Sequence, residues 1–262
     1  MSPSATFEGP TETDVSSLRS AILSEVASFD VDFFDDRDVA RIEHDDLYIR
    51  RFLLQNGSED LAVKTAIEAL RWRKKFRVND LRSRDVDRRL LSEGGMFAHN
   101  RDREGCKLLI FSVRKYEKQM FEFIEVKRLL SYWLDRIERE EYGKKVTVVF
   151  DLSDAGLENV DLQFVRHLIK LFKFYHPWML SKVILYDMPW IIQAVWKLIY
   201  SWLPSSSAEK IRFADKKTID QFIDKDQQLL RWGGTDQYEF EFREEVPGNT
   251  TPWLNSRSLH LM

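Results

Sequence analysis

The 262-residue sequence has a single cysteine, Cys106, so a fold built on internal disulfides is excluded. A lone thiol opening a strand is typical of an inert buried side chain, and the lack of disulfides favours the cytoplasm. The sequence has no apolar run of about 18 residues and no apolar signal-peptide segment at its start, so neither a membrane span nor secretion is predicted. The net charge of −3 excludes a generally basic nucleic-acid binder.

The common motifs of catalysis are also missing. The ten glycines form neither Gly-x-Gly-x-x-Gly nor Gly-x-x-x-x-Gly-Lys, no Gly-x-Ser-x-Gly occurs, and the five histidines show no metal-ligand spacing. Asp151 and Asp154 follow a buried strand, where carboxylates either cap turns or hold magnesium. A hydrolase or transferase built around these two aspartates is the least favoured of three functional hypotheses, and the other two are given below. We expect that the protein is not an enzyme and binds neither a cofactor nor a metal.

Charge is present but unevenly distributed. Residues 1–46 hold three basic and twelve acidic side chains, whereas residues 47–103 hold fourteen basic and eight acidic ones. The basic side chains are densest over residues 71–89. This block is either a solvated helix face paired with the acidic N-terminus or a face attracted to anionic lipid. In the second case, each well-placed Lys or Arg contributes roughly 1 kcal/mol of binding free energy. The sequence leaves both interpretations open.

Apolar spacing divides the chain into a helical front and an α/β remainder. Helical periodicity begins at Asp14, and further helices are predicted over residues 46–55, 59–76 and 84–93. The predicted divisions are a mobile tail (1–12), a helical subdomain (13–95), the main domain (96–236) and a C-terminal tail or linker (237–262).

Buried strands alternate with helices in the main domain. β-Branched and aromatic runs predict strands at Cys106–Val113, Lys145–Leu152, Lys182–Met188 and around Ile211–Phe213. Helices are predicted between the strands, with a last one near residues 215–224. These strand–helix–strand units imply an α/β fold, in which a mainly parallel mixed sheet is flanked by helices.

One segment, Met188–Pro204, is apolar on nearly every side. Pro189 suits a helix start and Pro204 stops the helix, leaving fourteen residues, about 21 Å at the usual rise and too short to span a bilayer. Such a helix is either buried on nearly all sides or a lid over an apolar cavity that also touches membrane, where Trp and Tyr favour the interface. Its polar residues form one narrow stripe: Gln193, Lys197 and Ser201.

Seven short motifs follow one another along the chain: Asp46–Leu53, Trp72-Arg73, Val149–Ser153, Tyr175–Pro177, Asp187–Trp190, Lys210–Phe213 and Gly233-Gly234. Over residues 40–236 their order and spacing resemble the CRAL-TRIO lipid-binding domain of the secretory phosphatidylinositol-transfer family. Within that family, the resemblance is closest to members whose lipid-binding domain precedes a major-sperm-protein domain and a C-terminal anchor at the endoplasmic reticulum.

The resemblance implies an apolar pocket closed by a gate helix, Trp190–Leu203, that encloses one lipid or other hydrophobic molecule. The implied function is non-enzymatic: lipid transfer, sensing or tethering at a membrane or lipid-droplet surface. The gate is expected to contact membrane through Trp190, Trp196 and Lys197. Strand alternation and the gate give these expected pocket residues: Phe111, Val113, Phe150, Phe174, Ile184, Tyr186, Ile191, Val195, Ile199 and Trp202.

The chain departs from the family at the head-group positions. Members that transfer phosphatidylinositol carry a basic pair where this chain has Asn56-Gly57, and a glutamate where it has Trp178. Only Lys210 matches the family's head-group set. Because a phosphorylated inositol needs fixed cations, we expect instead a neutral lipid, a sterol-like or other apolar ligand, or a pocket used mainly for docking.

Further expectations concern location and partners. We expect a monomer that has no nucleic-acid partner and associates peripherally with membrane in the cytoplasm. It would lie at the endoplasmic reticulum surface if the parent protein carries a C-terminal anchor. The alternative is a protein-interaction module with a vestigial pocket, which large residues between strand 182–188 and the gate helix would favour.

Overall fold

The computed structural model describes residues 9–117, 120–203 and 205–244. Residues 1–8 of the predicted N-terminal tail and residues 245–262 of the predicted C-terminal tail lie outside this description. In the part of the chain that is described, no helix combines the length and apolar character needed to cross a membrane.

Contacts divide the chain into two compact units. The first unit is Met1–Asn79 with Leu171–Trp178, and the second is Asp80–Lys170 with Met179–Met262. The predicted domains follow composition rather than contacts, so their bounds do not coincide with these units and stay a prediction.

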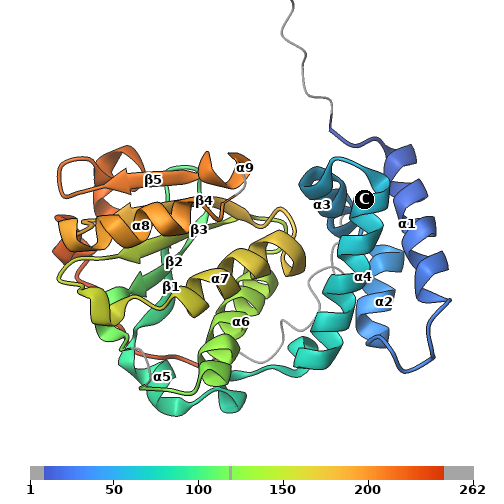
Figure 1. Ribbon diagram of the computed structural model, residues 1–262, viewed down its shortest axis with the longest axis horizontal. Coiled ribbons are helices and arrows are strands. Elements are labelled where there is room, and N and C mark those ends of the chain that lie inside the picture. Colours follow the sequence, from blue (N-terminus) through green and yellow to red (C-terminus); the bar gives the residue numbers. More distant parts are fainter. Residues whose placement is uncertain (1–8, 118–119, 204, 245–262) are drawn as a thin grey trace, which may run out of the picture. The chain divides into compact units, whose positions relative to one another are not determined.

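The first unit is helical (Figure 1). The Thr11 hydroxyl accepts a hydrogen bond from the Asp14 backbone N–H, and the Asp14 carboxylate accepts one from the Thr11 backbone N–H, which caps the first helix. Gly57 ends the third helix at φ +69°, a conformation that glycine adopts without strain. The predicted helices at 46–55 and 59–76 are confirmed. The elements are α1 (Glu12–Val26), α2 (Asp36–His44), α3 (Asp46–Asn56), α4 (Glu59–Phe76) and a π-helical segment (Leu171–Tyr175).

Side chains of α4 join the parts of this unit. The Trp72 ring stacks on that of Tyr175, with centroids 4.4 Å apart, and so fixes the π-helical segment to α4. Arg73 forms a buried ion pair with Asp38 of α2, Nε to Oδ1 2.6 Å. One member of the basic block is therefore paired with the acidic N-terminal stretch, whereas Lys74 and Lys75 beside it are exposed.

The second unit contains a five-stranded sheet with the spatial order β1-β2-β3-β4-β5 (Figure 1). β1 pairs antiparallel to β2, and the other neighbours pair parallel. The predicted α/β class with a mainly parallel mixed sheet is confirmed, although β1 is absent from the sequence prediction. The strands are β1 (Met96–Arg101), β2 (Lys107–Ser112), β3 (Val146–Asp151), β4 (Leu180–Tyr186) and β5 (Ile211–Ala214).

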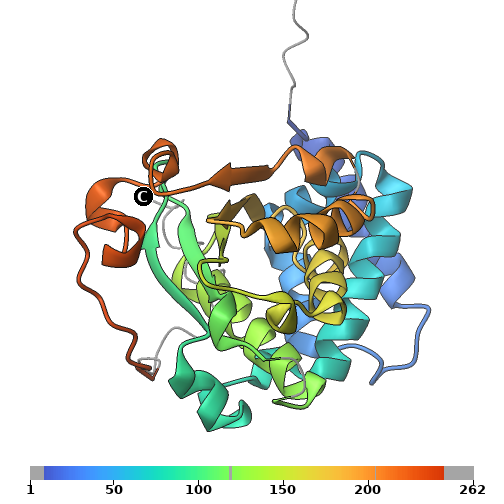
Figure 2. The same ribbon diagram turned by 60° about the vertical axis from the view of Figure 1, so that its left-hand side comes forward.

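Helices α6, α7 and α8 cover one face of this sheet (Figure 2), and the part of the segment after β5 that holds Trp232 packs against Tyr186 on the other. The predicted helix near 215–224 is wrong, because only a 3-10 turn forms there, at Ile219–Gln221. The Asp215 carboxylate accepts hydrogen bonds from the backbone N–H groups of Lys217 and Thr218, which closes a turn in place of a helix. The helices are α5 (Arg88–Glu93), α6 (Phe123–Glu140), α7 (Leu162–Lys170), α8 (Gln193–Tyr200) and α9 (Ser205–Ala208).

A buried carboxylate anchors the segment after β5 to the sheet. Asp151, at the end of β3, accepts hydrogen bonds from Arg231 Nε and from Trp232 Nε1, the latter at 2.9 Å. Asp154 is exposed and pairs with Arg114 at 3.3 Å. Asp151 is thus committed to holding the fold, since a buried carboxylate requires such partners.

Candidate functional site

A cavity of about 180 Å³ lies between one face of the sheet and helices α6, α7 and α8, with all its walls in the second unit. A single water needs roughly 15 Å³ of such space, so the cavity has room for a much larger guest. Most of its lining side chains are apolar. This combination is typical of a site for a hydrophobic small molecule.

Alternate residues of the strands form the floor of the cavity. Phe111 of β2 and Phe150 of β3 are in register, and their rings stack with centroids 4.9 Å apart. Both were expected on the wall, and the structure brings them together there. From β4, the lining residues are Val183 and Leu185.

The residues expected from β4, Ile184 and Tyr186, do not line the cavity. They occupy the alternate positions of the strand and so point to the opposite face, where the Tyr186 ring centroid lies 5.7 Å from that of Trp232. All four of these β4 residues are buried and hydrophobic in character, so the sequence pattern held no signal for choosing between the two faces.

The segment Trp190–Leu203, here called the roof segment, covers the cavity. It begins with a 3-10 turn, Trp190–Ile192, and continues as α8, so the α-helix is shorter than predicted. No residue of α8 is fully buried, and this excludes the interpretation as a helix buried on nearly all sides. The roof residues that face the cavity are Ile192, Trp196, Ile199 and Leu203.

The outer side of the roof segment exposes apolar side chains beside its polar stripe, Gln193, Lys197 and Ser201. Trp190 has 80% of its surface exposed, and Leu198 and Tyr200 are about half exposed. Phe213 of β5 is also exposed, and its ring lies edge-on to that of Trp196, with centroids 5.6 Å apart. Trp196, expected to contact membrane, lines the cavity and is partly buried, whereas Trp190 and Lys197 are exposed to solvent.

The other expected site residues are scattered. Val113 and Ile199 lie on the cavity wall, whereas Phe174 belongs to the first unit. Lys210 is not on the wall: its Nζ donates a hydrogen bond to the Leu180 carbonyl at 3.1 Å, and burial lowers the pKa of its ammonium. Three further expected residues lie off the wall, exposed or partly buried: Ile191, Val195 and Trp202.

Sequence reasoning missed the helical wall of the cavity. Six residues contribute from α6 and α7, and their i, i+3 or i+4 spacing is the signal that could have found them. They are Val126, Leu129, Phe164, Val165, Leu168 and Ile169.

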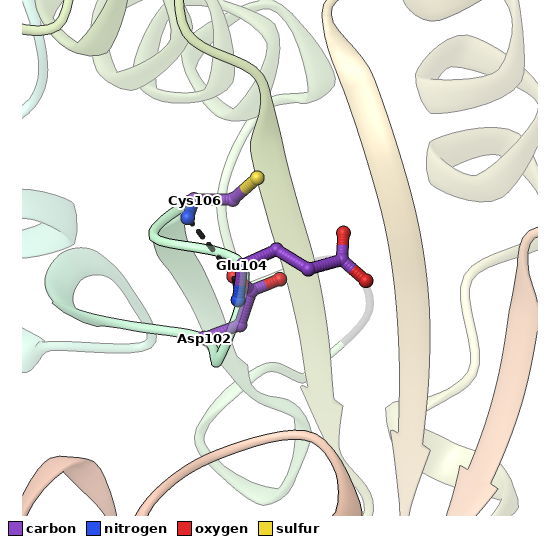
Figure 3. A group of neighbouring side chains, drawn as sticks. All are labelled: Asp102, Glu104 and Cys106. Carbon is purple, nitrogen blue, oxygen red and sulfur yellow. Dashed lines mark hydrogen bonds between the residues drawn. The ribbon is translucent and has the colours of Figure 1, made fainter.

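One group of potential metal ligands occurs in the described residues: Asp102, Glu104 and Cys106 (Figure 3). The Cys106 backbone N–H donates to Asp102 at 2.9 Å, and Lys182 Nζ lies 2.9 Å from Asp102 and 2.8 Å from Glu104. The lysine ammonium already pairs with both carboxylates and offsets one of their two negative charges. Burial raises the pKa of the Cys106 thiol, which keeps it protonated, so the cluster holds a turn.

Comparison with known proteins identifies the family. The sequence model of the CRAL/TRIO domain matches residues 91–234, more than half of the chain. The chain belongs to the CRAL/TRIO domain family. The crystal structure of Sfh5 shares this fold, with a TM-score of 0.66 over 97% of this chain and 99% of Sfh5, at 16% sequence identity.

Curated relatives of this CRAL/TRIO chain come from fungi. Phosphatidylinositol transfer protein CSR1 of Eremothecium gossypii is 27% identical over 219 residues, which cover 75% of this chain and 48% of the relative. A CRAL-TRIO domain-containing protein of Schizosaccharomyces pombe is 32% identical over 99 residues, 37% of this chain and 22% of the relative. The chain thus spans about half or less of the length of these two relatives.

Proposed function

We propose that this CRAL/TRIO chain is a non-enzymatic module that encloses one lipid or other hydrophobic molecule in its cavity. The observation that carries the proposal is an apolar cavity roofed by a short helix with no fully buried residue. Removing an acyl chain from water is favourable by about 0.8 kcal/mol per methylene. A lipid carrier needs an apolar wall around the lipid and a part of that wall that can open. The roof segment meets both requirements.

The roof segment acts as the gate and docks on a membrane or lipid-droplet surface. Its outer side presents Trp190 and Tyr200, and aromatic side chains favour the membrane interface. The net charge of −3 provides no general attraction to anionic bilayers. Apolar insertion is therefore the main docking force, and the basic block at residues 71–89 is a secondary aid.

The relative named a phosphatidylinositol transfer protein supports a lipid as the guest. Lys210, the one match to the family's head-group set, lies off the cavity wall, so the usual inositol geometry is disfavoured. Transfer, sensing and tethering all fit the proposal. We propose a monomer in the cytoplasm, associated peripherally with membrane, and with the endoplasmic reticulum if the parent protein carries an anchor.

A protein-interaction module with a vestigial pocket is the alternative. The open space between β4 and the roof segment favours ligand binding, because a vestigial pocket would be filled by its own side chains.

Photo-crosslinking tests the proposed site. A fatty acid with a diazirine in its chain is added to the purified protein, irradiated, and the labelled residues are mapped by mass spectrometry. We expect labels on Phe111, Phe150 and Leu185, and labels confined to the outer surface would contradict an enclosed ligand.

A further inference from the structure

The polarity of the cavity is uneven along its length. The wall under the roof segment is apolar, whereas the polar lining residues come from three places: the end of α5, the carboxyl end of β2, and the turn before α7. A guest with one polar group would therefore lie in one direction only, with that group at the β2 end. The polar lining residues are Glu93, Ser112, Lys115, Tyr116, Asn159 and Asp161.

Three of these residues are already committed to the protein itself. The Tyr116 hydroxyl donates to Asp161 at 2.7 Å, and Asp161 also accepts hydrogen bonds from the first backbone N–H groups of α7. Asn159 donates to the Tyr116 carbonyl at 2.8 Å and accepts from the Gly156 N–H at the same distance. These bonds close the loop and stabilise the buried carboxylate of Asp161.

Lys115 has donors to spare. The Lys115 ammonium carries three N–H donors and gives one to the Glu93 carbonyl oxygen, at 2.8 Å. Within the described part of the chain, Lys115 forms no ion pair with a carboxylate. The Ser112 hydroxyl accepts from Arg231 Nη2 at 3.2 Å and, since Ser112 follows Phe111 in β2, lies on the opposite face of the sheet.

The electrostatic surroundings of Lys115 are positive. Lys115 is exposed at the cavity's end, and desolvation by its surroundings, followed by the charges of Arg231 and Arg114, lowers the pKa of its ammonium, whereas the charge of Glu93 raises it. Arg231 is paired with Asp151, and Arg114 with Asp154. Lys115 is therefore the cation at this end whose charge an incoming anion would balance.

We propose that the cavity takes an amphiphile with a small anionic head, a carboxylate or a phosphate, held by Lys115 while its chain extends beneath the roof segment. The inference rests on the proposed function and deepens it, because it names the ligand class and orientation. It differs from the expectation of a neutral ligand, which rested on Asn56-Gly57, Trp178 and Lys210.

Equilibrium dialysis with ligands that share one acyl chain tests the head-group site. The probes are oleate, methyl oleate and 1-oleoyl lysophosphatidate, each below its aggregation limit, with wild type, Lys115→Gln, Lys115→Arg and Lys217→Gln. Lys217→Gln is the matched control, since it removes an exposed lysine of the same unit away from the cavity. Thermal melting of each variant verifies folding.

We expect at least one of the two anions to bind about tenfold more tightly than methyl oleate. Lys115→Gln should abolish that preference, while Lys115→Arg and Lys217→Gln retain it. A preference for oleate identifies a carboxylate, and one for lysophosphatidate a phosphate. Equal binding of all three probes, or a preference that survives in Lys115→Gln, would overturn the head-group site but leave the proposed function standing. If none of the three probes binds, both the head-group site and the proposed function fail.

Discussion

The guanidinium carbon of Arg166, on α7, lies 4.3 Å from the centre of the Trp202 ring, near the end of the roof segment. α7 is fixed to the core through Phe164 and Leu168, whereas α8 has no fully buried residue. This cation–π contact therefore joins a fixed helix to a weakly held one.

Arg166→Ala should loosen the roof segment. A cation–π contact at an exposed site contributes about 0.5–1 kcal/mol, which corresponds to roughly two- to fivefold faster amide exchange over residues 193–200. Hydrogen–deuterium exchange of the ligand-free protein measures this rate. Gln163→Ala, at an exposed position on the same helix, is the control. Unchanged exchange in Arg166→Ala would show that the contact does not hold the roof.

Trp190→Ala should weaken vesicle binding more than added salt does. Trp190 is the most exposed aromatic of the roof segment, so its replacement removes an apolar side chain that inserts into the membrane. Salt at 0.1 M weakens only the interactions between charges that are more than roughly 10 Å apart. Vesicle flotation in low and moderate salt makes the comparison. Leu230→Ala, an exposed apolar residue away from the roof, is the control. Binding that salt abolishes and Trp190→Ala retains would assign docking to the basic block at residues 71–89.

Val165→Trp should block ligand binding. Val165 lines the cavity from α7, and an indole at that position occupies the space of the guest. Because the new ring enters existing space, the free energy of unfolding should fall by no more than the roughly 1–3 kcal/mol typical of overpacking. Urea unfolding and oleate dialysis measure the two effects, with Leu61→Trp at an exposed position as the control. Full oleate binding by the folded Val165→Trp variant would place the ligand elsewhere.

His167 should make the fold sensitive to mild acid. Burial, followed by the charges of Lys127 and Lys170, lowers the pKa of His167 to about 4. Between pH 6.5 and 4 the unfolded chain then binds a proton that the folded chain does not, so the free energy of unfolding falls as the pH falls. Since this side chain is partly exposed, we expect a loss of only about 1 kcal/mol from pH 7 to 5.

Urea unfolding of His167→Gln at the two pH values isolates this effect. The variant should lose less stability on acidification than wild type, whereas His44→Gln, at an exposed histidine, should behave as wild type does. Identical acid sensitivity in wild type and His167→Gln would show that other groups control it.

The sequence predicted the fold where local signals were strong. The β-branched run of β3 and the helical periodicity of α3 each specify one local structure, and both form as predicted. β1 was missed because its sequence, Met96–Arg101, alternates weakly and depends on pairing with β2. Long-range pairing of this kind leaves little trace in a local pattern.

The site was harder to predict than the fold. Phe111 and Phe150 were placed on the cavity wall, but the choice of Ile184 over Val183 depended on which face of β4 the helices cover. That choice is made by tertiary packing, and β4 is apolar on both faces. Lys115 was overlooked because a lysine in a turn is ordinary until the cavity beside it is known.

Native mass spectrometry of the purified chain tests the central claim most directly, because it weighs the protein together with whatever its cavity holds. The account predicts a complex with one lipid-sized molecule per chain for the wild type, and none for Val165→Trp purified in the same way. A wild-type chain that stays empty through gentle purification and after incubation with lipid vesicles would contradict the account.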